Sequence, residues 1–175
     1  MPIRPTKWLI RLLMLWTVLA VLAVWWGLAG KIWIISGACL AALFLCDALL
    51  AFFVKKPTVT RSLPGRFAVS VEGEVTLRIA NNSSRFLHLS VHDGLPGNAD
   101  CELLPWRGWI KGNGYQDVIY PLTLHERGEQ YFETPHLLLT SPLGLWARHT
   151  RAGSEDSVKV YPNYQPVLRF ALMAM

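Results

Sequence analysis

Two histidines four residues apart come closest in this sequence to a metal-binding pattern. His88 and His92 would project from one face of a strand, and imidazole nitrogens bind zinc and copper well. Neither a carboxylate nor a cysteine stands at a spacing that completes the ligand set. In the alternative that the chain is an enzyme with a site at the membrane face, the neighbouring Asp93 would be a candidate catalytic residue together with the two histidines. The sequence therefore predicts no metal, no cofactor and no catalytic residue.

Other catalytic patterns are equally incomplete. A nucleophilic serine would need a Gly-x-Ser-x-Gly elbow, which the sequence does not contain. Gly112-Asn113-Gly114 lacks the third glycine of a phosphate loop and predicts a hairpin turn instead. Cys101 stands next to Glu102 and has no basic neighbour, so its thiol is not activated. The three cysteines form no Cys-x-x-Cys pair, which favours a reducing compartment. We expect a protein that is not an enzyme.

Two tryptophans close together form a candidate interaction surface. Trp106 and Trp109 flank Arg107 and Gly108 in a segment between predicted strands. Exposed aromatic residues beside a cation are typical of protein contact sites. The alternative is that both indole rings pack into the core or against a loop.

A single acid lies inside an otherwise apolar segment. Asp47 would stand opposite Met14 in an antiparallel helix pair, about one turn deeper than Arg11. A long arginine side chain can reach along a helix to such a carboxylate, which predicts an interhelical pair between Arg11 and Asp47. Two alternatives remain open, an interfacial acid in contact with water and a contact with a partner helix or an ion path.

These residues depend on two long apolar segments, Leu12 to Ala29 and Ile32 to Val54. About 20 apolar residues in a helix cross a bilayer core, and neither segment contains proline. We predict spans at 8–29 and 32–54, joined by an external turn at 30–31. A cleaved signal peptide is the alternative for the first segment, but its apolar run is long and a second span follows at once.

Basic residues predict the orientation of this hairpin. Residues 1–7 and the stretch after the second span are rich in lysine and arginine, whereas Lys31 is alone in the turn, so both ends are expected in the cytoplasm. The net charge of +5 comes from residues 1–56, which hold six basic side chains and one acid; the remainder holds eleven of each. A nucleic-acid partner is therefore not expected, and the lipid bilayer is.

From Pro57 onward, short alternating runs replace the continuous apolar pattern. Leucine, valine, isoleucine and tyrosine alternate with polar residues in the runs 75–80, 86–92 and 118–124, and further strands are predicted at 137–140 and 158–161. Turn residues at 81–84 and 126–129 predict two hairpins. The fold class is thus an α+β membrane protein: a two-helix transmembrane hairpin followed by an antiparallel, immunoglobulin-like β-sandwich in the cytoplasm, over residues 55–164.

The order of the motifs resembles the bacterial membrane family called domain of unknown function 58. The matching segments are Thr60-Arg61-Ser62-Leu63-Pro64, Asn81-Asn82, Val91-His92-Asp93-Gly94-Leu95-Pro96, Glu126-Arg127-Gly128-Glu129-Gln130-Tyr131, Ser141-Pro142-Leu143-Gly144-Leu145-Trp146 and Val160-Tyr161-Pro162. Together they extend over nearly the whole chain.

The resemblance implies a location, a role and a missing part. Members of the family are multi-pass proteins of the bacterial inner membrane, and they are thought to act with MoxR-type AAA+ ATPases in the assembly of envelope or other complexes. They continue into a von Willebrand factor A-like domain, whose signatures the sequence lacks. The apolar residues 165–175 are expected to be a truncated linker or helix start, and a fragment without independent function is the alternative.

Overall fold

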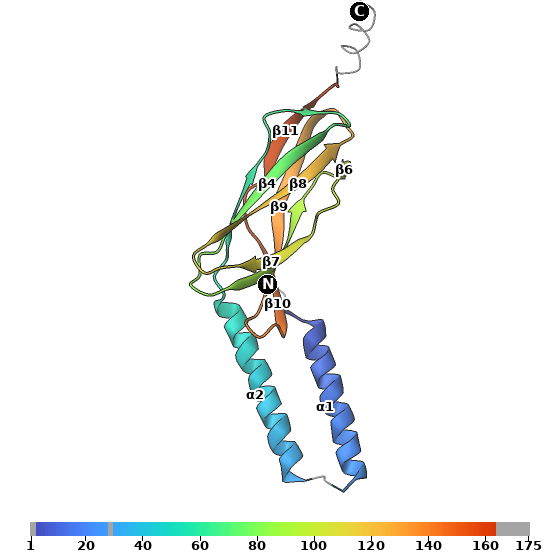
Figure 1. The fold of residues 1–175 in the computed structure, drawn as a ribbon, viewed down its shortest axis with the longest axis vertical. Coiled ribbons are helices and arrows are strands. Elements are labelled where there is room, and N and C mark those ends of the chain that lie inside the picture. Colours follow the sequence, from blue (N-terminus) through green and yellow to red (C-terminus); the bar gives the residue numbers. More distant parts are fainter. Residues whose placement is uncertain (1–2, 28–29, 164–175) are drawn as a thin grey trace, which may run out of the picture.

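The computed structural model describes residues 3–27 and 30–163, in which two antiparallel helices stand at one end of a β-sandwich (Figure 1). Helix α1 is Lys7–Trp25 and helix α2 is Lys31–Phe53. At 1.5 Å per residue they are about 28 and 35 Å long. Both are long and apolar enough to cross a membrane. The two predicted helices are confirmed, but Lys31, predicted in the turn, begins α2.

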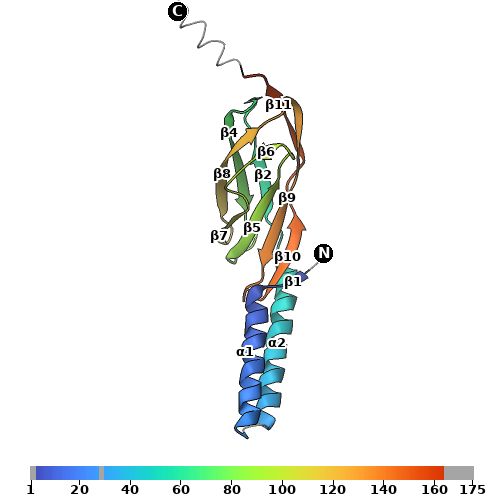
Figure 2. The ribbon, with the colours of Figure 1, turned by 90° about the vertical axis from the view of Figure 1, so that its right-hand side faces the viewer.

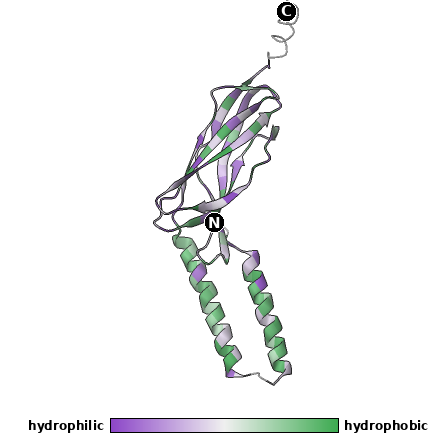
Figure 3. Cartoon of the chain, viewed as in Figure 1, coloured by the Kyte–Doolittle hydropathy of each residue, from purple (hydrophilic) through white to green (hydrophobic). Residues whose placement is uncertain are grey.

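Most residues of both helices are apolar, with a few polar ones among them (Figure 3). Their buried residues are Leu9, Ala23, Asp47 and Ala51. Between the helices, the Trp16 ring meets the Trp33 ring edge-on at a centroid distance of 6.1 Å. Most of the large apolar side chains of the hairpin therefore face outward.

The residues that the structure describes include eleven β-strands in two sheets. The larger sheet lies against the smaller one (Figure 2). The four-stranded sheet has the order β2-β4-β8-β6, with bounds Thr58–Ser62, Glu72–Ala80, Tyr115–Leu124 and Ala99–Asp100. The seven-stranded sheet contains β1 (Ile3–Pro5), β10 (Trp146–Arg151), β9 (Gly128–Thr140), β11 (Asp156–Tyr161), β3 (Phe67–Ala68), β5 (Leu87–Gly94) and β7 (Trp106–Ile110). Strand pairing is antiparallel except between β11 and β3.

The core lies between the two sheets and includes the residues predicted from alternation. Val75, Leu77 and Ile79 of β4 are fully buried, as are Leu89 and Val91 of β5. The inward residues of β8 are Val118, Tyr120, Leu122 and Leu124. Because side chains alternate between the faces of a strand, the polar residues between them point outward. The predicted β-sandwich is confirmed.

The predicted β-hairpins are wrong. Strands β4 and β5, joined by residues 81–86, belong to different sheets, and so do β8 and β9, joined by residues 125–127. Gly112-Asn113-Gly114 likewise leads from β7 in one sheet to β8 in the other. Alternation indicates which face of a strand is buried, but it does not indicate which strand pairs with it. These turns therefore cross between sheets.

Strand β9 is the longest strand and organises the larger sheet. Its first half pairs with β11, and its second half pairs with β10 on the same edge and with β5 on the other. The sequence predicted a separate strand at 137–140, whereas β9 continues through it from Gly128 to Thr140. The true hairpin of the domain is β9–β10, whose turn is residues 141–145.

The segment before α1 is part of the sandwich. β1 pairs antiparallel with β10, with Arg4 opposite Ala147, whereas residues 1–7 were predicted only as a cytoplasmic tail. A proline at position 5 fits an edge strand, since its missing N–H is not needed there. The linker predicted at 165–175 lies outside the described residues.

Candidate functional site at the helix–sandwich junction

The β9–β10 turn reaches down between the ends of α1 and α2 that face the sandwich (Figure 1). We call residues 141–146, Ser-Pro-Leu-Gly-Leu-Trp, the junction turn. Inside it, the Ser141 N–H donates to Trp146 O at 2.8 Å and the Gly144 N–H to Ser141 O at 2.9 Å. Gly144 has φ +77°, a backbone region that a residue with a side chain rarely adopts. The sequence is thus suited to a tight, closed turn.

Asp47 of α2 binds the junction turn. Its carboxylate accepts hydrogen bonds from Ser141 Oγ at 2.6 Å, from Leu143 N–H at 3.1 Å and from Leu145 N–H at 3.2 Å. The side chain is fully buried. A buried carboxylate is tolerated only where donors surround it, and here a single turn provides three.

Helix α1 holds the same turn from the other side. Thr6, the residue before the first turn of α1, donates its hydroxyl to Gly144 O at 2.6 Å and its N–H to Leu145 O at 2.9 Å. The usual role of a threonine at this position is to cap its own helix. Here its hydroxyl makes no cap bond and connects the start of α1 to the sandwich instead.

Strand β10 adds contacts to the end of α2. Trp146 Nε1 donates to Phe44 O at 3.0 Å. The Arg148 guanidinium donates to Phe52 O at 2.9 Å and to Val54 O at 2.7 Å. The last carbonyls of a helix have no partner within it and carry partial negative charge, so a buried cation is favourable there. Both helices are therefore hydrogen-bonded to one β-hairpin.

The predicted pair between Arg11 and Asp47 is wrong. It does not occur among the ion pairs of the described residues, and the Arg11 guanidinium lies 5.5 Å from the centre of the Trp8 ring. Asp47 is also no water-exposed acid, because it is fully buried. The reason is tertiary: the junction turn, 94 residues further along the chain, occupies the space beside it.

A second buried polar cluster joins the two sheets. Arg61 of β2 donates from Nε and Nη2 to the Asp93 carboxylate of β5, and from Nη1 to Asp156 at 2.8 Å. Tyr120 of β8 donates its hydroxyl to the same Asp93 carboxylate. The side chains of Arg61 and Asp93 are 1% and 0% exposed. This bidentate pair is completely removed from water.

The surroundings raise the pKa values of two members of this cluster, Arg61 and Tyr120. Burial alone would lower the pKa of Arg61, but the hydrogen bonds and charge of Asp93 raise it above its ordinary value. Burial, followed by the charge of Asp93, raises the pKa of the Tyr120 hydroxyl far above its usual range. The phenol therefore stays protonated and remains a donor. The cluster therefore stabilises the contact between the two sheets.

The residues of the predicted interaction surface, Trp106, Arg107 and Trp109, do not all lie on the same face of β7. Trp106 faces the core and covers Gly108, where an added Cβ would collide with its ring. Arg107 and Trp109 point outward, and Trp109 is 67% exposed. Residues three apart in a strand necessarily lie on opposite faces. Only the second tryptophan contributes to a surface.

The two histidines that come closest to a metal-binding pattern make separate local contacts. His88 Nδ1 lies 3.0 Å from Thr140 Oγ1, and its ring lies 4.5 Å from the Trp109 ring. His92 Nδ1 lies 2.8 Å from Asp93 O. Within residues 3–27 and 30–163, no three histidine, cysteine or acidic side chains are placed to hold a metal.

Two features of the junction were missed at the sequence level. Ser141 and Arg148 were not proposed as site residues, although the junction turn was recognised as a motif. A lone acid in an apolar helix was the available signal, because a buried carboxylate must have donors somewhere. The sequence did not indicate that a loop of the β-domain provides them.

Comparisons with known proteins give only distant likenesses. No model of a known protein family matches, and no curated protein matches. A mutant Salmonella alpha-2-macroglobulin is 15% identical over 62% of this chain, with a TM-score of 0.46, and this chain covers 7% of its length. The CARDB domain of the PF1109 protein of Pyrococcus furiosus is 12% identical over 61% of this chain and 90% of its own, with a TM-score of 0.43.

A third solved structure is similar in the same way. The PapD-like domain 7 of human CEP192 is 13% identical over 62% of this chain and 84% of its own, with a TM-score of 0.41. All three likenesses are below a TM-score of 0.5, and none bears on function. The comparisons therefore assign the chain to no family.

Proposed function

We propose that this chain is a noncatalytic, membrane-anchored interaction protein. The α1–α2 hairpin sits in the bilayer, and the sandwich is held against the cytoplasmic surface as a platform for protein contacts. The resemblance to the domain of unknown function 58 family supports the bacterial inner membrane as the location. The observation that carries the proposal is the junction turn, which hydrogen-bonds both helices to the sandwich.

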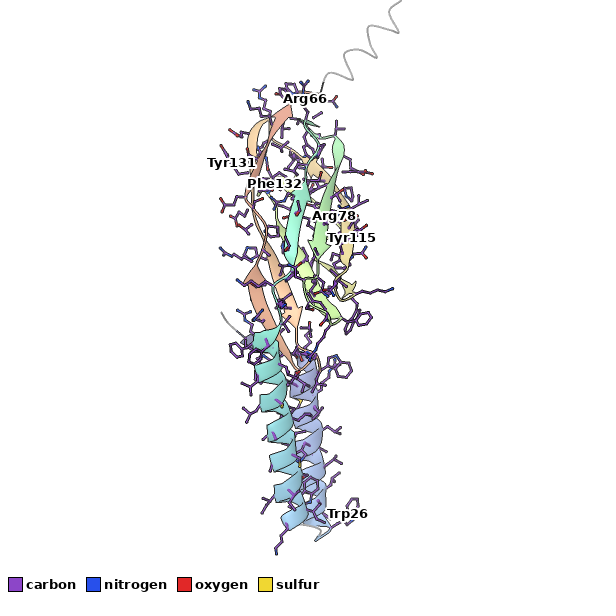
Figure 4. The ribbon with its side chains drawn as sticks, turned by 90° about the vertical axis from the view of Figure 1, so that its left-hand side faces the viewer. Trp26, Arg66, Arg78, Tyr115, Tyr131 and Phe132 are labelled. Carbon is purple, nitrogen blue, oxygen red and sulfur yellow. The ribbon has the colours of Figure 1, made fainter. Side chains whose placement is uncertain are left out.

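The helix surfaces support a membrane location. Trp25, Ile32 and Phe53 are 86%, 77% and 80% exposed, and exposure of this kind continues along both helices. In water such a surface would drive aggregation, whereas in lipid it is solvated. Trp26 lies at the end of the hairpin farthest from the sandwich (Figure 4), where aromatic side chains typically sit at a bilayer interface.

The distribution of charge supports a cytoplasmic sandwich. Arg4, Lys7 and Arg11 lie at the sandwich end of α1, and Lys55 and Lys56 follow α2. Lys31 alone stands at the opposite end. Excess lysine and arginine flank the cytoplasmic ends of membrane helices.

The class of partner follows from the resemblance. Proteins of that family are thought to act with MoxR-type AAA+ ATPases, and we propose such an ATPase as the partner of the sandwich. Co-purification of an ATPase of this class with the detergent-solubilised full chain is the relevant measurement. A monodisperse chain that retains no such ATPase would contradict this partner.

Cysteine accessibility tests the anchoring. In a variant in which Cys39, Cys46 and Cys101 are replaced by alanine, single cysteines are introduced as Lys31→Cys or Arg127→Cys, both at exposed positions. A membrane-impermeant thiol reagent should label the first variant in intact cells and the second only after lysis. Labelling of Arg127→Cys in intact cells would show that the sandwich lies outside the cytoplasm and would contradict the proposed orientation. Recovery of the chain in the soluble fraction would contradict the membrane anchoring.

A further inference from the structure

A groove of about 630 Å³ lies where α2 meets the sandwich. One wall is the last turn of α2, with Leu50 and Phe53, and the other is formed by the 83–88 segment and Trp109. Thr140 and Pro142 also line the groove, and Pro142 belongs to the junction turn. The volume falls within the roughly 300–1,000 Å³ typical of small-molecule sites.

The polar part of the groove is basic. Lys55 and Arg85 line it, with hydroxyl groups from Ser84 and Thr140, and none of its lining residues is acidic. Neither cation forms an ion pair with any residue that the structure describes. Both are exposed. Arg61 and Arg78, by contrast, form ion pairs with aspartates. The groove therefore offers two free positive charges to an anion.

The remainder of the groove is apolar and aromatic. Phe53, Phe86 and Trp109 are 80%, 67% and 67% exposed, and Phe53 belongs to the lipid-facing surface of α2. In a bilayer that encloses α2 up to Phe53, this position is at the level of the headgroups. Aromatic rings and cations are both favoured at that depth.

We infer that the groove binds an anionic phospholipid of the same leaflet, with the headgroup phosphate at Lys55 and Arg85 and the acyl chains along Leu50 and Phe53. This inference rests on the proposed membrane anchoring. Charge complementarity selects the anionic headgroup, and continuity with the apolar face of α2 selects a lipid over a soluble anion. Such a lipid would also contact the sandwich through Phe86 and Trp109.

Lipid retention by the full chain provides the test. The chain is reconstituted in nanodiscs of phosphatidylcholine with a minor fraction of phosphatidylglycerol, and the lipids that remain bound after detergent release are counted by native mass spectrometry. We expect phosphatidylglycerol to be retained in preference. In the variant Lys55→Gln/Arg85→Gln the preference should fall about ten-fold or more, since each cation near anionic lipid contributes roughly a five-fold factor.

Two further variants make the result specific. Arg127→Gln/Lys159→Gln removes the same charge at exposed positions in the β8–β9 connection and on β11, outside the groove, and should retain the native preference. Ser84→Glu places an acid in the lining without removing a cation and should also abolish the preference. Equal retention of both lipids by the native chain, or equal losses in the groove and distal variants, would overturn the inference. Failure to enter nanodiscs of phosphatidylcholine alone would instead refute the anchoring on which it rests.

Discussion

The variant Asp47→Ala is expected to unfold with a free energy lower than that of the native chain by about 3 kcal/mol or more. The substitution leaves Ser141 Oγ and the N–H groups of Leu143 and Leu145 buried without an acceptor. Each buried donor that loses its partner costs about 1–3 kcal/mol. Urea titration of the full chain in detergent, followed by tryptophan fluorescence, measures the difference.

Hydrogen exchange locates the same effect. In Asp47→Ala the amides of Leu143 and Leu145 should exchange faster, whereas amides in β4 should change much less. Leu49→Ala is the matched control, since its side chain lies on the same helix and is 59% exposed. Unchanged stability and unchanged exchange of the two amides in Asp47→Ala would show that the carboxylate does not hold the turn.

The variant Asp93→Ala should lose about 3–5 kcal/mol of unfolding free energy, because it leaves the Arg61 guanidinium buried without its main counter-charge. It also removes the acceptor of the Tyr120 hydroxyl. The loss should appear as a lower urea midpoint with an unchanged slope, since the surface exposed on unfolding stays the same.

The chain contains a close control for this prediction. Arg78 and Asp117 form a similar bidentate pair between adjacent strands, with both side chains partly exposed, and Arg78 lies beside Tyr115 on the surface (Figure 4). The hydrogen bond and charge of Arg78 lower the pKa of Asp117. Since water solvates this pair, Asp117→Ala should change stability far less than Asp93→Ala. Equal effects of the two variants would contradict the role assigned to burial.

The parts of the fold that could be predicted depend on local pattern. Continuous apolar runs predicted α1 and α2, and the alternation of Val75, Leu77 and Ile79 predicted which face of β4 is buried. Strand pairing could not be predicted in this way. Three turns that were expected to form hairpins cross between the sheets, because a turn sequence permits either connection.

The junction could not be predicted for a related reason. Asp47 was recognised as unusual, but its partners lie about 94 residues away in sequence, and local spacing favoured Arg11. The pairing of Arg61 with Asp93 could not be predicted either, because these residues are 32 positions apart in the sequence and on different sheets. By contrast, the opposite facing of Trp106 and Trp109 was available from strand periodicity alone.

We expect the junction turn to fix the orientation of the sandwich relative to the helices. The distance between spin labels on α2 and in the β8–β9 connection, introduced as Leu45→Cys and Arg127→Cys in the variant without native cysteines, tests it directly. Double electron–electron resonance on the full chain in nanodiscs should give one narrow distance distribution. The additional substitution Asp47→Ala should broaden it. A broad distribution in the chain that retains Asp47 would show that the sandwich moves freely on its anchor and would contradict the account.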